Sequence, residues 1–137
     1  MRLDFSLILV VALTATAHAQ SFTTAAEVRP ILEMTRAQWI AVREWEGQDL
    51  LYFTHLESWR CGLQSVVFGI NGDDPTQVYE LGPCDETSAN PNVLDLENHL
   101  PFIAFPAQSI GTVKVRVTFD DDSTDEVEFE RSAIMIP

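Results

Sequence analysis

A strict alternation of apolar and polar residues near the end of the chain constrains the fold more than any other feature. The apolar positions are Val113, Val115, Val117 and Phe119, and then Val127 and Phe129. A period of two places successive side chains on opposite faces of a strand, so the segment predicts a β-hairpin with one buried and one exposed face. We expect the turn to be centred on Asp122. This register sets Arg116 opposite Glu128 and Val117 opposite Val127.

A second hairpin is predicted over residues 39–45 and 49–56. Both segments are rich in aromatic and apolar residues, and Glu46-Gly47 separates them. Pairing Trp45 with Gln48 sets Val42 opposite Leu51. Apolar groups then fall on both faces, and we therefore expect both faces of this hairpin to be covered.

Further strand-like segments cover residues 61–70, 77–81 and 101–105, the last as an edge strand because it begins with proline. Residues 82–101 are the least regular part. A short helix is expected over residues 27–35, with Pro30 in its first turn because proline lacks an N–H group. About seven short strands with frequent turns predict a mainly β domain, either a small antiparallel sandwich or an open barrel, with a short N-terminal helix.

The first 19 residues have the pattern of a secretory signal peptide. Arg2 precedes an apolar segment over residues 7–13, and small residues follow at Ala15, Ala17 and Ala19. A transmembrane helix needs about 20 apolar residues, so we expect no stable membrane insertion. Cleavage after Ala19 would leave residues 20–137 as a single β-rich domain, exported to the periplasm or the extracellular space.

Cys61 and Cys84 are the only cysteines of the chain. An even number of cysteines in an exported protein favours a structural disulfide. The two residues lie much farther apart in sequence than the cysteines of a redox-active Cys-x-x-Cys motif. Closing the loop between them would stabilise the fold by about 3.4 kcal/mol in the chain-entropy model.

Acidic residues outnumber basic ones by 21 to 8, which gives a formal net charge of −13. Binding to nucleic acid depends on Lys and Arg that neutralise phosphates, so the composition argues against a nucleic-acid partner. It argues equally against binding to anionic lipid. The surplus of Asp and Glu is typical of a surface that keeps an exported protein in solution, with a basic partner or a bound cation as the alternative.

The chain lacks the motifs of common hydrolases and zinc enzymes. It contains no Gly-x-Ser-x-Gly and no His-Glu-x-x-His pattern. Beyond residue 19 the histidines are His55, expected on a strand, and His99, expected in an exposed loop. The enzyme alternative is a small secreted hydrolase that uses His55 with a nearby carboxylate.

The acidic segment over residues 120–125 offers the oxygen ligands that calcium prefers. Its candidate ligands are Asp120, Asp122 and Asp125. The segment lacks the glycine and the terminal glutamate of an EF-hand loop, and it also suits the exposed tip of a hairpin. We expect no cofactor, and a calcium-stabilised structural module is the alternative.

Aromatic residues gather around the first predicted hairpin. Core packing is their default role, but Trp45 and Trp59 lie near expected strand ends and close to charged residues. An exposed aromatic beside a charged residue suits a binding surface. We therefore predict an exported, disulfide-containing binding or accessory module without a catalytic motif. Its protein or small-molecule ligand would contact Arg43, Trp45, His55, Trp59 and Arg60.

Overall fold

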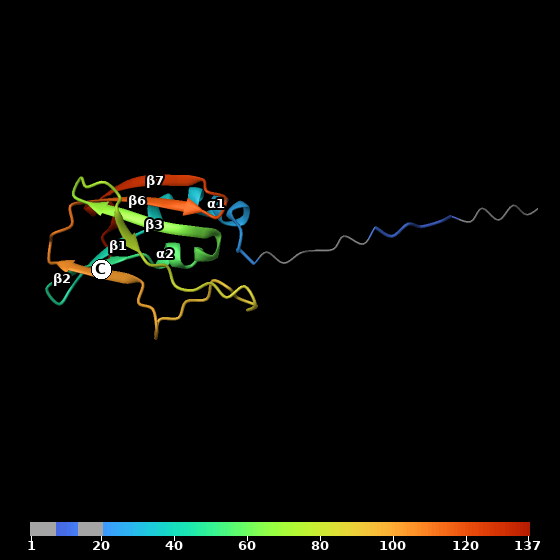
Figure 1. The fold of residues 1–137 in the computed structure, drawn as a ribbon, viewed down its shortest axis with the longest axis horizontal. Coiled ribbons are helices and arrows are strands. Elements are labelled where there is room, and N and C mark those ends of the chain that lie inside the picture. Colours follow the sequence, from blue (N-terminus) through green and yellow to red (C-terminus); the bar gives the residue numbers. More distant parts are fainter. Residues whose placement is uncertain (1–7, 14–20) are drawn as a thin grey trace, which may run out of the picture.

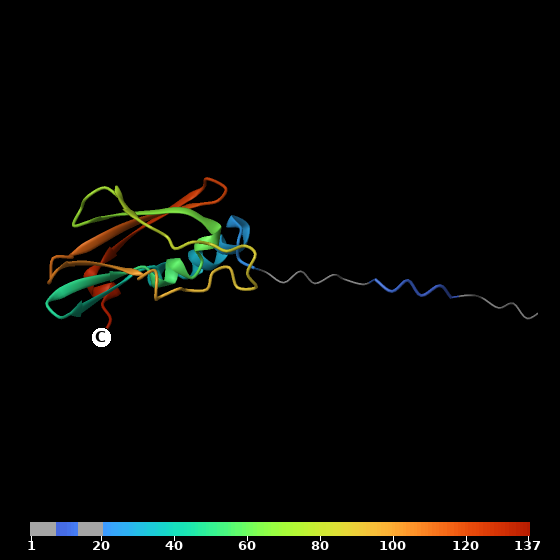
Figure 2. The same ribbon diagram turned by 60° about the horizontal axis from the view of Figure 1, so that its bottom comes forward.

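The computed structural model describes residues 8–13 and 21–137. Most of the expected signal peptide, including the cleavage position after Ala19, lies outside these residues, and residues 8–13 adopt no helix or strand. Residues 21–137 form two antiparallel sheets stacked as two layers, with α1 and α2 at one end and the turn between β1 and β2 at the other (Figures 1 and 2).

Seven strands make up the two sheets, which confirms the predicted mainly β class. In the three-stranded sheet, β2 (Gln48–Tyr52) lies between β1 (Ala41–Trp45) and β5 (Phe102–Pro106). The order in the four-stranded sheet is β4 (Gln77–Tyr79), β3 (Leu63–Ile70), β6 (Thr112–Phe119) and β7 (Thr124–Glu130). Among the described residues, strand β5 pairs with β2 alone, so the expected edge strand is confirmed.

The N-terminal helix is present as α1 (Ala25–Met34), but it begins earlier than expected. Thr24 caps it, because the Thr24 Oγ1 atom accepts a hydrogen bond from the Glu27 N–H and donates to the Glu27 carboxylate. Pro30 therefore lies in the second turn, and our prediction that it lies in the first is wrong. Its missing N–H leaves the Ala26 carbonyl without the usual partner inside the helix.

Two short helices, α2 (Thr54–Glu57) and α3 (Arg131–Ile134), were not expected, and the 3₁₀ turns η1 (Arg36–Gln38) and η2 (Arg60–Gly62) complete the fold. The second predicted strand ends at Tyr52 rather than at residue 56, so His55 lies on a helix and not on a strand. Phe53 N–H donates to the carbonyl of Pro101, and the Glu57 N–H then donates to the carbonyl of Phe53 to close the first helical turn.

The core lies between the two sheets and extends under α1. The three-stranded sheet contributes Val42 and Leu51, while β6 contributes a row of valines, all fully buried. At the helical end, Leu32 is fully buried and its carbonyl accepts a hydrogen bond from the Trp39 Nε1–H at 2.9 Å. Trp39 is therefore a core residue whose polar atom is satisfied.

The predicted register is right for one hairpin and wrong for the other. Trp45 pairs with Gln48 as expected. In the β6–β7 hairpin, however, Arg116 faces Glu126 instead of Glu128. The turn is tighter than expected, because the Phe119 N–H donates to the Ser123 carbonyl and Asp122 adopts a positive φ of 68°. A shift by two residues keeps every side chain on its predicted face.

Cys61 and Cys84 form the predicted disulfide, with their Cα atoms 5.3 Å apart. The bond joins η2 to residues 82–101, which contain no helix or strand, as expected. This segment packs at the end of the sandwich that carries α1 and α2 (Figures 1 and 2). Within the part of the chain that the structure describes, no helix has the length and apolar character needed to cross a membrane.

Candidate binding site

The outer face of the three-stranded sheet carries aromatic side chains and one arginine. Because Val42 and Leu51 face the core, the alternate positions of the paired strands point outward. Trp45 is 48 % exposed on this face, so the expectation that both faces of the first hairpin are covered is wrong at this end. Tyr52 and Phe102 are opposite each other in the register, and their ring centroids are 5.2 Å apart.

Arg43 lies over the ring of Trp45, with its guanidinium carbon 4.1 Å from the ring centroid. The two residues are two positions apart on β1 and therefore project from the same face. A cation stacked on indole is attracted by the ring and is held in one orientation. Among residues 21–137, Arg43 forms no ion pair with a carboxylate.

The other arginines of the described domain have acidic partners. Arg36 pairs with Asp125 and Arg116 with Glu126, and Arg29 contacts Asp121. Arg60 and Arg131 also face carboxylates. The guanidinium of Arg43 differs in that an aromatic ring holds it, which leaves its N–H groups available to an external acceptor.

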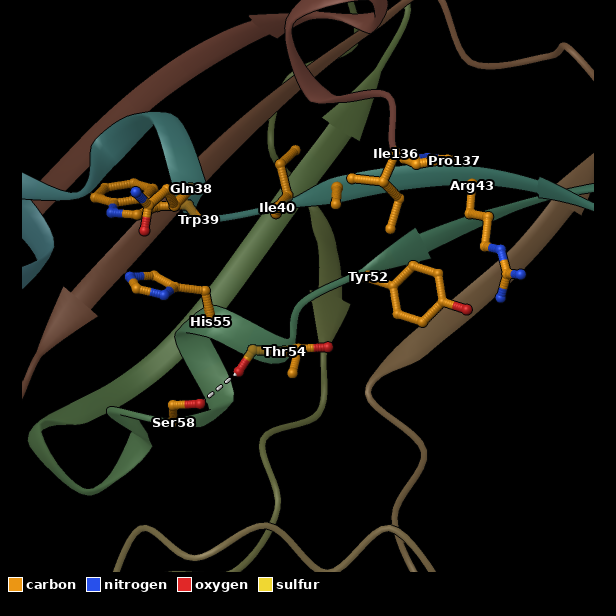
Figure 3. Close-up of a pocket in the computed structure, with 11 residues that line it drawn as sticks. Gln38, Trp39, Ile40, Arg43, Tyr52, Thr54, His55, Ser58, Ile136 and Pro137 are labelled. Carbon is orange, nitrogen blue, oxygen red and sulfur yellow. Dashed lines mark hydrogen bonds between the residues drawn. The ribbon is translucent and has the colours of Figure 1, made fainter.

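An open cavity of about 550 Å³ runs from Arg43 along the outer side of β1 and β2 to α2. Figure 3 shows Arg43 and Tyr52 at one end of it, and His55 with Gln38 at the other. Ile136 and Pro137 form an apolar wall above β1 (Figure 3). Ligand pockets commonly have volumes of about 300–1,000 Å³, so this cavity has room for a small molecule.

The Thr35 hydroxyl holds His55 in one tautomer. Its Nε2 atom lies 2.8 Å from the Thr35 Oγ1 atom, and the Thr35 hydroxyl donates its proton to the Ile31 carbonyl at 2.6 Å. The Thr35 oxygen must therefore accept from the His55 Nε2–H, which leaves Nδ1 as an acceptor. Burial lowers the pKa of His55 below its usual value, so the ring is neutral at neutral pH.

A backbone hydrogen bond holds the apolar wall of the cavity against β1. Ile136 N–H donates to the Val42 carbonyl at 2.9 Å, which aligns the end of the chain with β1. Just before it, Arg131 binds the fully buried Asp49 with two hydrogen bonds of 2.6 and 2.9 Å. The guanidinium of Arg131 is the main cause that lowers the pKa of Asp49 to about 2.

Three of the five predicted binding residues lie in or beside this cavity, and two lie elsewhere. Arg43 and His55 line it, and Trp45 lies beside it under Arg43. Trp59 instead packs against Phe22, with ring centroids 5.1 Å apart. Its Nε1 atom is buried and has no hydrogen-bond partner among the described residues.

Arg60, the other distant residue, is buried and is only 6 % exposed. Its guanidinium donates to carbonyl oxygens of residues 57, 83, 91, 92 and 93. These contacts organise the irregular segment over residues 82–101. They leave little of the side chain for a ligand.

The carboxylates of the acidic turn over residues 120–125 contact different partners. Asp122 accepts from the Gln64 amide at 2.6 Å, and Asp125 pairs with Arg36 at 2.7 Å. Within the described part of the chain, no group of three or more His, Cys, Asp or Glu side chains is arranged to hold a metal ion. Calcium binding by Asp120, Asp122 and Asp125 stays a prediction.

His99 differs from its expected exposed position. Its side chain is 28 % exposed, and its Nε2 atom lies 2.8 Å from the buried carboxylate of Glu57. The hydrolase alternative requires a histidine with a carboxylate beside it, and His99 has such a partner, whereas the described partner of His55 is Thr35. No sequence motif indicated this pair, because the two residues are 42 positions apart.

No protein-family model matches this chain, and comparisons with curated proteins and with solved structures give no significant match.

Proposed function

We propose that the protein is an exported binding module for a small molecule that carries an anionic group on an apolar body. The ligand occupies the cavity on the outer face of the three-stranded sheet. The observation that carries the proposal is Arg43, which is stacked on Trp45 at the cavity without an acidic partner in the described structure. The disulfide and the signal-peptide pattern support export to the periplasm or the extracellular space.

Because the chain is strongly acidic, an arginine without an ion pair indicates where an anion could bind. A protein with a formal charge of −13 repels anions over most of its surface, so it attracts an anion only where a cation is available locally. The planar guanidinium matches a carboxylate or phosphate with two parallel hydrogen bonds. Its stacking on Trp45 orients the donors in advance, which reduces the entropy lost when a ligand binds.

The rest of the cavity sets the remaining features of the ligand. Tyr52, beside Arg43, and Ile136 offer apolar surface to the body of the ligand. At the far end, the Nδ1 atom of His55 accepts a hydrogen bond from a ligand hydroxyl or amine, because Nε2 is already engaged with Thr35. A protein partner would need contacts beyond this cavity, whereas a small molecule fits within it.

Calorimetric titration with phenylbutyrate and with its uncharged amide tests the proposal. We expect the carboxylate to bind more tightly than the amide. Arg43→Gln should weaken phenylbutyrate binding by about tenfold or more, since a hydrogen bond to a charged group contributes about 1.5–3 kcal/mol. The amide should be affected little.

Lys114→Gln is the matched control. It removes the same charge from a cation that also has no ion pair among residues 21–137, but Lys114 is on β6 of the other sheet. We expect this variant to bind phenylbutyrate like the wild type. Equal binding of the carboxylate and the amide, equal losses in the two variants, or no binding of phenylbutyrate at millimolar concentration would contradict the proposal.

A further inference from the structure

A buried polar network joins α2, β4 and the irregular segment over residues 82–101. At its centre is Glu57, which is 1 % exposed. Its carboxylate accepts from the Gly82 N–H at 2.9 Å and lies 2.8 Å from the His99 Nε2 atom. Tyr79 is also close, because its hydroxyl lies 3.3 Å from the same His99 nitrogen.

A donor and a cation lie next to the Glu57 carboxylate. The Arg60 Nε atom lies 3.7 Å from the carboxylate, and the Gly82 N–H can act only as a donor. Burial, together with the hydrogen bond to Glu57 and the charge of that group, raises the pKa of Tyr79, so its hydroxyl stays protonated. The Gly82 N–H and the Arg60 guanidinium thus face the carboxylate as a donor and as a cation.

This arrangement defines the proton positions on His99. Because the Glu57 carboxylate is an acceptor, Nε2 of His99 carries a proton and donates it. In the neutral ring, Nδ1 is then an unprotonated acceptor. No hydrogen bond found within residues 21–137 involves this atom.

His99 lines a cavity of about 160 Å³ beneath residues 82–101, separate from the site at Arg43. The cavity is walled mainly by apolar side chains, namely Pro83, Pro91, Val93, Leu94, Leu96 and Pro101. An apolar cavity of about 150 Å³ is large enough for benzene. The space therefore suits a molecule with a single small ring or a short branched chain.

The charges around the cavity exclude an anion. Asp85 and Asp95 line it together with Glu57, and the Arg60 guanidinium already donates to backbone carbonyls. An anionic ligand would face these carboxylates without a free cation. A neutral ligand with one hydrogen-bond donor would satisfy Nδ1 of His99 and leave the network intact.

We propose that this cavity is a second ligand site, specific for a small neutral molecule with an apolar body and one hydroxyl group. The body packs against the prolines and leucines of residues 82–101, and the hydroxyl donates to Nδ1 of His99. The buried Glu57 is a positioning residue, which holds the imidazole in this tautomer. This site is independent of the proposed anion site, because α2 presents His55 to one cavity and Glu57 to the other.

Phenol and toluene are matched probes, since they have nearly the same size and differ in the hydroxyl group. We expect phenol to bind the full domain about fivefold more tightly than toluene in an NMR titration, the effect of a hydrogen bond of roughly 1 kcal/mol. His99→Phe keeps an aromatic ring of similar shape but has no acceptor nitrogen. In this variant phenol should bind no more tightly than toluene.

Leu94→Trp is a second variant, which fills the cavity while the network is left in place. It should abolish binding of both probes, and Lys114→Gln, on β6 and outside both cavities, should change neither affinity. Equal affinities for phenol and toluene in the wild type would overturn the proposal. So would no binding of phenol at millimolar concentration, or phenol binding that survives Leu94→Trp.

Discussion

The two outer faces of the sandwich differ in the groups that lie next to their cationic side chains. On the four-stranded sheet, Arg116 pairs with Glu126 at 2.8 Å, and Lys114 lies opposite Glu128 in the register. On the three-stranded sheet, Arg43 stacks on an exposed tryptophan instead. The Arg116 guanidinium is engaged by a carboxylate, and Lys114 lies opposite one without an ion pair among residues 21–137. Arg43 is instead held by an aromatic ring, so its hydrogen-bond donors are oriented and free for a ligand. The comparison identifies the three-stranded face as the better candidate for binding.

The largest expected difference concerns two tryptophans of the same hairpin region. Trp39 is 0 % exposed, and Trp39→Ala should lower the free energy of unfolding by about 3–5 kcal/mol because it leaves a cavity. Trp45 is 48 % exposed, so Trp45→Ala should cost less than about 1 kcal/mol. Urea unfolding of both variants measures the difference. A Trp45→Ala loss as large as that of Trp39→Ala would mean that the aromatic face is structural.

Two arginine pairs form the next contrast. Arg131→Ala leaves the fully buried Asp49 without its partner and should destabilise the fold by about 3–5 kcal/mol. The Arg116–Glu126 pair is exposed, and Arg116→Ala should cost less than about 1 kcal/mol. Denaturant titrations of the two variants test this order. Similar losses of unfolding free energy would show that the buried Arg131–Asp49 pair contributes no more than the exposed Arg116–Glu126 pair.

Lowering the pH is expected to have a smaller effect on the stability of the fold. The folded-state pKa of Asp49 is lowered from 3.8 to about 2, so the unfolded chain binds the proton more tightly than the folded protein. The stabilisation from this group is present above about pH 4 and is lost as the pH falls towards 2. Unfolding measured across this range should show a weaker acid dependence in Asp49→Asn than in the wild type. The same acid dependence in Asp49→Asn and in the wild type would show that Asp49 does not cause the loss of stability at low pH.

The first hairpin was predictable because its turn is short. Glu46 and Gly47 both adopt positive φ, as a two-residue hairpin turn requires, and only one register then aligns Trp45 with Gln48. The acidic turn before β7 allows several loop lengths. Registers two residues apart bury the same faces, so the apolar pattern could not distinguish them.

The site was only partly predictable, for reasons of spacing. Arg43 and Trp45 share one face of a strand, so their proximity follows from the period of two. Phe53 and Leu56 are both fully buried, and their separation by three positions was the signal for α2 that the strand prediction missed. The pairing of Glu57 with His99 depends on the tertiary fold, and no local pattern encodes it.

Mapping phenylbutyrate binding by amide chemical shifts tests the central claim most directly. We predict that the largest shifts will be in β1 around Arg43, at Tyr52 and His55, and at the indole N–H of Trp45, with β6 and β7 unaffected. Shifts concentrated on β6 and β7, or no saturable shifts at all, would contradict the assignment of the three-stranded face as the binding surface.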